Sequence, residues 1–209
     1  AAFLRISGDG KMEADAAQRS RELAAPLPEL QTIQKMIDAV GGTLDLSQVL
    51  REAARTAVES LDAAATGIFL YDADSDTLVL AEEKGLPVNL KTRFRRFPVK
   101  GFHNEQVVRA ARVRLHGSPA DIPEFVDLRI PQQQPDWGNY LCVPLTAKKQ
   151  VLGIMGIFSR RPRIFNDRDL TLYRALGEQI GLAISNARAH EVLQLLAITD
   201  GLTGVFNRR

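Results

Sequence analysis

An α+β fold is predicted for this chain of 209 residues from three features of its sequence. Two pairs of short apolar segments are each joined by turn-forming residues, which is typical of antiparallel β-hairpins. Apolar residues at helical spacing precede the first pair and follow the second. A proline-rich stretch lies between the two pairs. These features indicate an antiparallel sheet flanked by helices, with long helical segments at both ends.

The composition excludes several classes of protein. Hydrophobic residues make up 45% and charged residues 25% of the chain, as in ordinary globular domains. The net charge of +2 is too small to indicate a nucleic-acid partner. No apolar run reaches the length of about 18 residues that crosses a bilayer, so we expect no direct membrane contact. The single cysteine, Cys142, excludes an intrachain disulfide and is consistent with a cytoplasmic location.

The first part of the chain is predicted to be helical. Residues 1–28 are rich in helix formers and end in two prolines, which indicates an N-terminal helical extension or linker. Residues 29–44 carry a narrow apolar stripe with alternating spacings of three and four, which is typical of a paired helix. Asp45 then caps a third helix, with Gln48 in the capping-box position.

The middle of the chain alternates strands and turns. The first hairpin is expected at 68–71 and 77–81, around an aspartate-rich turn, and an exposed strand at 93–97. A helix is expected at 103–112. Four prolines indicate that residues 115–138 are mostly loop with short pieces of structure. The second hairpin is expected at 139–146 and 151–159.

The last helix has the clearest start. Asn166 is a good N-cap, and acidic residues occupy the first turn. The pattern continues without proline to about Ile198, a length of about 50 Å. Because such a helix is longer than a small domain, its end must project beyond the sheet.

Four strings, in this order and spacing, resemble the GAF domain family. They are Val143-Pro144-Leu145, the run 151–157, Phe165 with Asp169, and the run 179–188. The resemblance covers residues 29–190. It implies a PAS-related central antiparallel sheet of about six strands, with the terminal helices on one face and a ligand pocket on the other. It also implies a parallel homodimer.

The string Asp200-Gly201-Leu202-Thr203, followed by Asn207-Arg208-Arg209, resembles the entry to a GGDEF domain, the diguanylate cyclase module. We therefore expect an exit helix at 191–199 and the start of a truncated GGDEF domain at 200–209. The resemblance implies a sensory domain that controls cyclic di-GMP synthesis through a dimeric helix. The catalytic body is absent, so we expect no catalysis by this fragment and assign no catalytic residue.

Side chains on the terminal helices and at the junction are the candidates for dimerisation and coupling. They are Leu30, Ile33, Ile37 and Val40 on the first stripe, Ala187, His190, Leu193, Leu196 and Ala197 on the exit helix, and Asp200, Thr203, Asn207 and Arg208 at the junction. The alternative for a helical stripe is packing on its own domain, and we expect this for residues 173–184. The expected partner is a second copy of the chain.

The candidate ligand pocket combines apolar walls with a few polar groups. Its residues cluster in and around the irregular middle of the chain: Phe97, Phe102, His103, Asn104, Val107, Arg114, His116, Asp121, Phe125, Trp137, Tyr140 and Cys142. The ligand is an unknown small molecule. The alternative is an aromatic core without a ligand, in which case the domain only dimerises and relays a signal.

No metal site is expected, because no two of the three histidines His103, His116 and His190 have a metal-ligand spacing. No cofactor is required by the sequence. A haem held by His103 or His116, as in a gas or redox sensor, is a third alternative. Cys142 is expected to be a small buried residue within a strand.

Overall fold

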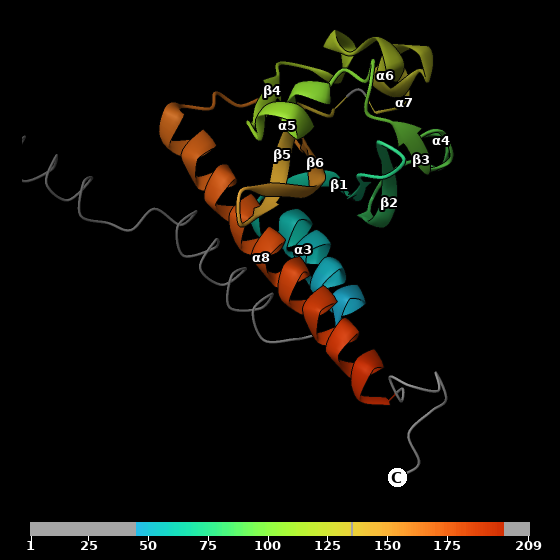
Figure 1. Ribbon diagram of the computed structural model, residues 1–209. Coiled ribbons are helices and arrows are strands. Elements are labelled where there is room, and N and C mark those ends of the chain that lie inside the picture. Colours follow the sequence, from blue (N-terminus) through green and yellow to red (C-terminus); the bar gives the residue numbers. More distant parts are fainter. Residues whose placement is uncertain (1–44, 135, 199–209) are drawn as a thin grey trace, which may run out of the picture.

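The structure, a computed structural model, describes residues 45–134 and 136–198 (Figure 1). Its helices and strands are α3 (Leu46–Ser60), β1 (Ala63–Asp72), β2 (Thr77–Lys84), α4 (Val88–Arg93), β3 (Arg96–Pro98), α5 (Glu105–Ala110), β4 (Arg114–His116), the 3-10 turn η1 (Pro119–Asp121), α6 (Pro123–Asp127), α7 (Ile130–Gln133), β5 (Tyr140–Ala147), β6 (Gln150–Ser159) and α8 (Asp167–Ile198). The helices predicted before Asp45 lie outside the described residues.

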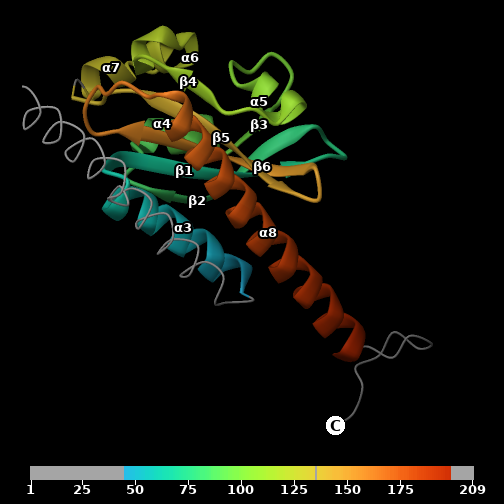
Figure 2. The same cartoon turned by 90° about the vertical axis from the view of Figure 1, so that its left-hand side faces the viewer.

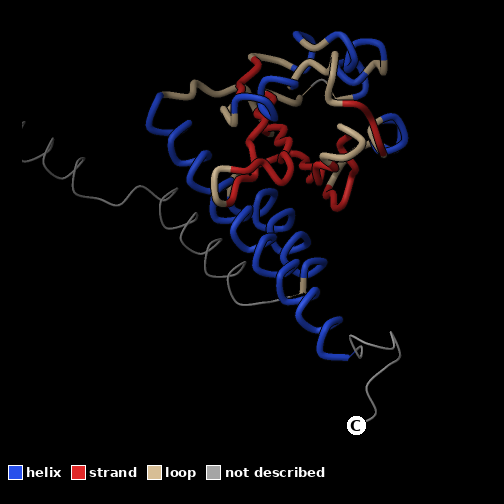
Figure 3. Tube along the Cα trace, viewed as in Figure 1, coloured by secondary structure: helices blue, strands red, loops and turns tan. Residues whose placement is uncertain are grey.

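The strands gather at the centre of the domain (Figure 3). They form a six-stranded antiparallel sheet in the order β3-β2-β1-β6-β5-β4. The two central strands, β1 and β6, have ten residues each, whereas the edge strands β3 and β4 have three. Short edge strands limit pairing with other chains. The α+β fold with about six strands is therefore confirmed.

Both predicted hairpins are present, and local backbone geometry explains the second. Lys148 and Lys149, between β5 and β6, both have positive φ angles, of 49° and 66°. Two consecutive left-handed residues make the turn type whose twist matches that of the flanking strands. The hairpin register is thereby fixed, with Ala147 opposite Gln150.

Helices α3 and α8 cover one face of the sheet (Figures 1 and 2). Asp45 caps α3 by accepting a hydrogen bond from the Gln48 amide at 2.9 Å. At the start of α8, Asn166 and Asp169 each accept a hydrogen bond from the other's backbone amide, at 3.0 and 2.9 Å. Both predicted caps are confirmed. Among the described residues, no helix has the length and apolar character that crossing a membrane requires.

The core beneath these two helices is aliphatic and closely packed. Its fully buried large side chains are Ile68, Leu141, Leu145, Met155, Leu176, Ile180 and Ile184. Burying each of them contributes roughly 1.5–3 kcal/mol. A Cβ on Gly177 of α8 would lie 2.2 Å from the Pro144 carbonyl oxygen of β5. The helix backbone therefore touches the strand backbone.

The opposite face is covered by short helices, and here two predictions need correction. The short pieces of structure predicted in residues 115–138 are present but take up more of the segment than expected, because Pro119, Pro123 and Pro131 each lie in the first turn of a short helix. Proline suits that position, where its missing N–H is not needed. The strand predicted at 93–97 is shorter, because α4 continues to Arg93 and β3 begins only at Arg96.

Candidate functional site

The face opposite α3 and α8 carries a second core made largely of aromatic rings. Side chains alternate along a strand, so Phe69, Ile154 and Phe158 point to this face while their neighbours Ile68, Met155 and Ile157 point to the helices. The rings meet mainly edge to face. Phe94 and Phe97 have centroids 5.1 Å apart, and Phe94 and Phe125 have centroids 6.0 Å apart.

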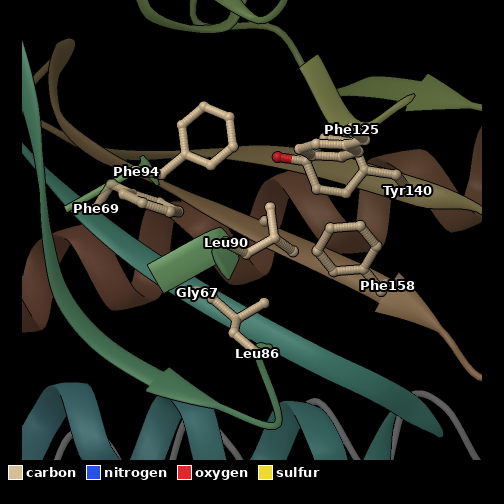
Figure 4. A pocket seen from close by; sticks show the side chains of 9 residues that line it. Gly67, Phe69, Leu86, Leu90, Phe94, Phe125, Tyr140 and Phe158 are labelled. Carbon is tan, nitrogen blue, oxygen red and sulfur yellow. The ribbon is translucent and has the colours of Figure 1, made fainter. Parts of the chain in front are cut away.

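A small cavity lies within this aromatic core (Figure 4). It is lined by Gly67, Phe69, Leu86, Leu90, Phe94, Phe125, Tyr140, Gly156 and Phe158. Its volume is about 20 Å³, room for about one water molecule. Among the described residues that line it, only Tyr140 contributes a polar side-chain atom, and Figure 4 shows its hydroxyl pointing toward the side where Phe94 lies.

A chain of buried polar groups reaches this cavity from the side. His116 Nε2 lies 3.3 Å from Asn104 Oδ1, and Asn104 donates from Nδ2 to the Tyr140 hydroxyl at 3.3 Å. Asn104 and Tyr140 are buried, and His116 is half-buried. The chain therefore links a partly exposed imidazole to the one polar group of the cavity wall.

His103 lies behind the same wall, with its ring 5.2 Å from Phe125 and 5.9 Å from Tyr140, centroid to centroid. Its side chain is only 8% exposed. Nδ1 lies 3.3 Å from Glu124 Oε1, but the two are not aligned, and neither ring nitrogen has a hydrogen-bond partner. Burial lowers the pKa of His103 to about 4, although the Glu124 carboxylate opposes the shift. The imidazole is therefore neutral at neutral pH.

Cys142 is fully buried on this face. Burial raises the pKa of its thiol to about 12 and also raises the pKa of Tyr140. The thiol therefore stays protonated and unreactive, and the prediction of a small buried residue is confirmed. In the part of the chain that the structure describes, no three histidine, cysteine or acidic side chains could together hold a metal ion.

The structure brings most of the predicted pocket residues to one face but not to the cavity itself. Phe125 and Tyr140 line the cavity. The remaining apolar candidates pack in the surrounding core: Phe97, Phe102, Val107, Trp137 and Cys142. Arg114 and Asp121 are exposed and do not line the cavity. Arg114 lies on an edge strand, and the Asp121 carboxylate caps η1 by accepting from the Ser118 amide at 2.8 Å.

Most of the cavity lining was missed by the sequence reasoning: Gly67, Phe69, Leu86, Leu90, Phe94, Gly156 and Phe158. The signal existed in the central strands, where alternate residues of β1 and β6 share a face. It was hidden because β6 is apolar on both faces. For Leu86, Leu90 and Phe94 the sequence held no such signal, because they reach the cavity through α4 and its flanks.

The coupling candidates on α8 fall into two groups. Ala187 is buried and His190 half-buried, and both lie beside Asp45, Leu46 and Ser47 at the start of α3. Leu193, in contrast, is 64% exposed. The expected packing of residues 173–184 on their own domain holds for Tyr173, Leu176, Ile180, Ala183 and Ile184, all buried.

The other coupling candidates are not placed. For Leu196 and Ala197 the structure describes only the helical backbone. The rest lie outside the described residues: Leu30, Ile33, Ile37, Val40, Asp200, Thr203, Asn207 and Arg208. Their roles remain predictions.

Comparison with known proteins assigns the fold and the family. No curated protein sequence matches the chain. The GAF domain of a phosphoenolpyruvate-protein phosphotransferase from Coxiella burnetii covers 79% of this chain and 98% of its own, with 19% identity and a TM-score of 0.66. The free methionine-R-sulfoxide reductase from Neisseria meningitidis covers 80% and 95%, with 18% identity and a TM-score of 0.64. These identities show the fold alone. A sequence model of the GAF domain matches residues 43–185, most of the chain, and the chain therefore belongs to the GAF domain family.

Proposed function

We propose that this chain is the sensory and regulatory GAF domain of a diguanylate cyclase. A small ligand, or a signal from an upstream domain, shifts the packing of a dimeric exit helix and so controls cyclic di-GMP synthesis. The observation that carries the proposal is the continuity of α8. One helix of 32 residues begins on the sheet and leads to the GGDEF-like string that starts at Asp200.

The two ends of α8 have different surroundings, which suits a relay. Leu176, Ile180 and Ile184 are 0–1% exposed against the sheet and α3. Beyond them Val192 and Leu193 are 55% and 64% exposed. An apolar stretch of helix that the described residues of its own domain leave exposed favours pairing with a second copy. A cyclase that joins two GTP molecules needs two GGDEF domains face to face, so the geometry of this pair would set its activity.

The proposed input is the cavity on the opposite face of the sheet. β1 and β6 line it with one side and carry the helix core on the other, so a change in their positions reaches α8 directly. A reductase of the same fold was solved in complex with its substrate, which supports a small-molecule site in this architecture. A ligand shifts the equilibrium only if it binds the two helix packings with different affinities.

The test, called here the helix-phase experiment, rotates the end of the exit helix relative to the GAF domain by inserting residues. The chain is fused after Arg209 to the catalytic body of an active diguanylate cyclase, and one to four alanines are inserted after Ala189. Each residue rotates the helix end by about 100°. Cyclic di-GMP synthesis should fall with the two-residue insertion and recover with the four-residue insertion, which restores the phase to within about 40°. Equal synthesis by all insertions would contradict the proposal. The 209-residue chain alone should form no cyclic di-GMP from GTP.

A second candidate is a ligand-free module that only dimerises and relays a signal. The small cavity volume of about 20 Å³ favours it, because the pocket is almost filled by the protein's own side chains. Native mass spectrometry of the purified chain distinguishes the two. A retained small molecule supports the ligand-binding function, and a bare chain that still passes the phase experiment supports the relay.

A further inference from the structure

The floor of the cavity is a patch of sheet without side chains. Gly67 of β1 and Gly156 of β6 are direct partners across the two central strands, and both face the cavity. A Cβ on Gly156 would lie 2.8 Å from the Tyr140 hydroxyl, and one on Gly67 would lie 2.9 Å from Leu86 Cδ1. The paired glycines therefore leave a shallow hollow in the middle of the sheet, which Tyr140 and Leu86 partly fill.

The walls around this hollow are rings. Phe69, Phe94, Phe125, Phe158 and Tyr140 surround it (Figure 4). Aromatic walls favour a flat apolar guest, which can stack or meet ring edges. None of the described lining residues is charged. A charged guest would lose its hydration without gaining a counter-charge, and this is costly.

The Tyr140 hydroxyl is the one group that can select among such guests. Its oxygen accepts a hydrogen bond from Asn104 Nδ2, so its own proton is free to be donated. The hydrogen-bonding neighbour left for that proton is the Cys142 sulfur, and sulfur is a weak acceptor. An oxygen or nitrogen acceptor on a guest would take the proton in its place.

The cover of the cavity is a short helix held by few contacts. Leu90 lies in α4 and is the only buried residue of that six-residue helix, and Leu86 lies just before it. The Asn89 amide ties α4 to the Leu128 carbonyl at 3.0 Å, and Lys91 pairs with Glu83 at 3.0 Å near the surface. A benzene-sized guest needs a cavity on the order of 150 Å³, so binding requires α4 to shift outward with both leucines.

We propose that this cavity binds an uncharged molecule of about one aromatic ring that carries a single hydrogen-bond acceptor, which takes the proton of the Tyr140 hydroxyl. The inference rests on the proposed function, because it names the chemical class of the ligand that the sensory pocket takes. Binding moves α4 outward and leaves the ring stacked over Gly67 and Gly156.

Calorimetric titration of the 209-residue chain with three probes tests this proposal. Acetophenone has the ring and the carbonyl acceptor, ethylbenzene has the same shape without the acceptor, and benzoate has the charge. Acetophenone should bind about tenfold more tightly than ethylbenzene, the value of roughly one good hydrogen bond. Benzoate should not bind.

Tyr140→Phe removes only the hydroxyl. It should weaken acetophenone about tenfold, to the level of ethylbenzene, and leave ethylbenzene unchanged. The matched control is Tyr71→Phe, because the Tyr71 hydroxyl bonds Asp76 at 2.8 Å outside the cavity; it should change neither affinity. Gly67→Ala adds a methyl group to the floor beside the flexible end of Leu86, and it should weaken both probes by the same factor.

Three outcomes would overturn the inference: no binding of acetophenone, tighter binding of benzoate, or an unchanged preference in Tyr140→Phe. Each of them leaves the proposed function standing if the helix-phase experiment succeeds. Conversely, a failed phase experiment with acetophenone bound as expected would retain the ligand class and reject the link to the cyclase. A melting curve of each variant confirms that it is folded.

Discussion

The two faces of the central sheet are built from the same strands but on different principles. On the face covered by α3 and α8, here called the helix face, aliphatic side chains such as Leu176 and Ile184 are fully buried. The α8 backbone touches β5 at Gly177. On the opposite face, here called the ring face, the core holds a cavity, and neither ring nitrogen of His103 has a hydrogen-bond partner. Among the described residues, the helix face has one buried side-chain polar atom without a partner, Thr56 Oγ1, whereas the ring face has three, on His103 and Glu124, beside its cavity. The ring face therefore retains more of the unpaired polar groups that a purely structural core would remove.

The two faces are also covered by helices of different length. Long regular elements, α3 and α8, cover the face that holds the domain together. Short helices of four to six residues cover the other face. Elements of that size have little stability of their own and can shift without unfolding the sheet. We therefore expect substitutions on the helix face to cost more stability than matched substitutions on the ring face.

Matched leucine truncations should separate the two faces most clearly. Leu176→Ala removes a side chain that is 1% exposed under α8, and we expect a loss of about 4 kcal/mol in the free energy of unfolding. Leu90→Ala removes one that is 3% exposed under the short helix α4. We expect α4 to settle into the gap and the loss to be about 2 kcal/mol. Urea denaturation measures both. Equal losses would mean that the ring face is as rigid as the helix face.

Acid should weaken the fold through the ring face. The pKa of His103 is about 4 in the folded protein and 6.5 as its ordinary value, so the unfolded chain binds the extra proton first. Stability should therefore be full above pH 6.5 and fall as the pH drops toward 4, by roughly 3 kcal/mol in total. His116, whose pKa burial also lowers, adds in the same direction.

His103→Gln should flatten this pH dependence, because the variant has no imidazole to protonate behind the wall. His190→Gln, on α8, is the matched control and should leave the dependence in place. Urea midpoints between pH 7 and pH 4.5 give the comparison. A smaller dependence from His116 should remain, whereas a dependence of undiminished size in His103→Gln would assign it to another group.

Two glycine substitutions compare how much room each face has. In Gly177→Ala the new Cβ meets the Pro144 carbonyl oxygen at 2.2 Å, so helix and strand must separate; we expect a loss of about 2–3 kcal/mol. In Gly67→Ala the nearest atom is Leu86 Cδ1, the end of a flexible side chain, and we expect less than about 1 kcal/mol. Thermal denaturation of both variants measures the difference. A larger loss in Gly67→Ala would contradict the comparison.

The smallest effect on stability is expected at the exposed end of α8, beyond the sheet. Leu193→Lys changes a residue that is 64% exposed, so the free energy of unfolding should change by less than about 0.5 kcal/mol. The proposed homodimer should nevertheless dissociate more readily, because the substitution places a charge between the two paired exit helices. Light scattering across a concentration series measures this, with Gln194→Lys as the control of equal charge. If the unmodified chain is monomeric at high micromolar concentration, the proposed pairing of exit helices is excluded.

The helix face could be predicted closely from the sequence because its signals are local. Asn166 with Asp169 marks the start of α8, and an apolar residue at every third or fourth position marks its buried side. The turn residues of both hairpins gave the strands of the sheet. The GAF resemblance implied the six-stranded sheet and its two different faces.

The ring face could be predicted only in part, because its cavity is assembled from distant segments. Phe125 and Tyr140 were found from their place in the irregular middle. Gly67 and Gly156 are 89 positions apart in the printed sequence and become a floor only through strand pairing. The prolines at 119, 123 and 131 were read as helix breakers, although they start helices once the neighbouring turns pack on the sheet.

The contact between Trp137 and Phe158 gives the domain an intrinsic fluorescent reporter of the cavity. The Trp137 ring packs at a tilt against Phe158, with centroids 4.4 Å apart, and Phe158 lines the cavity. The chain has a single tryptophan, so all of its indole emission arises at this place. Any ligand that displaces Phe158 changes the surroundings of this indole. The occupancy of the cavity can therefore be followed in the unlabelled protein by the wavelength and intensity of its tryptophan emission.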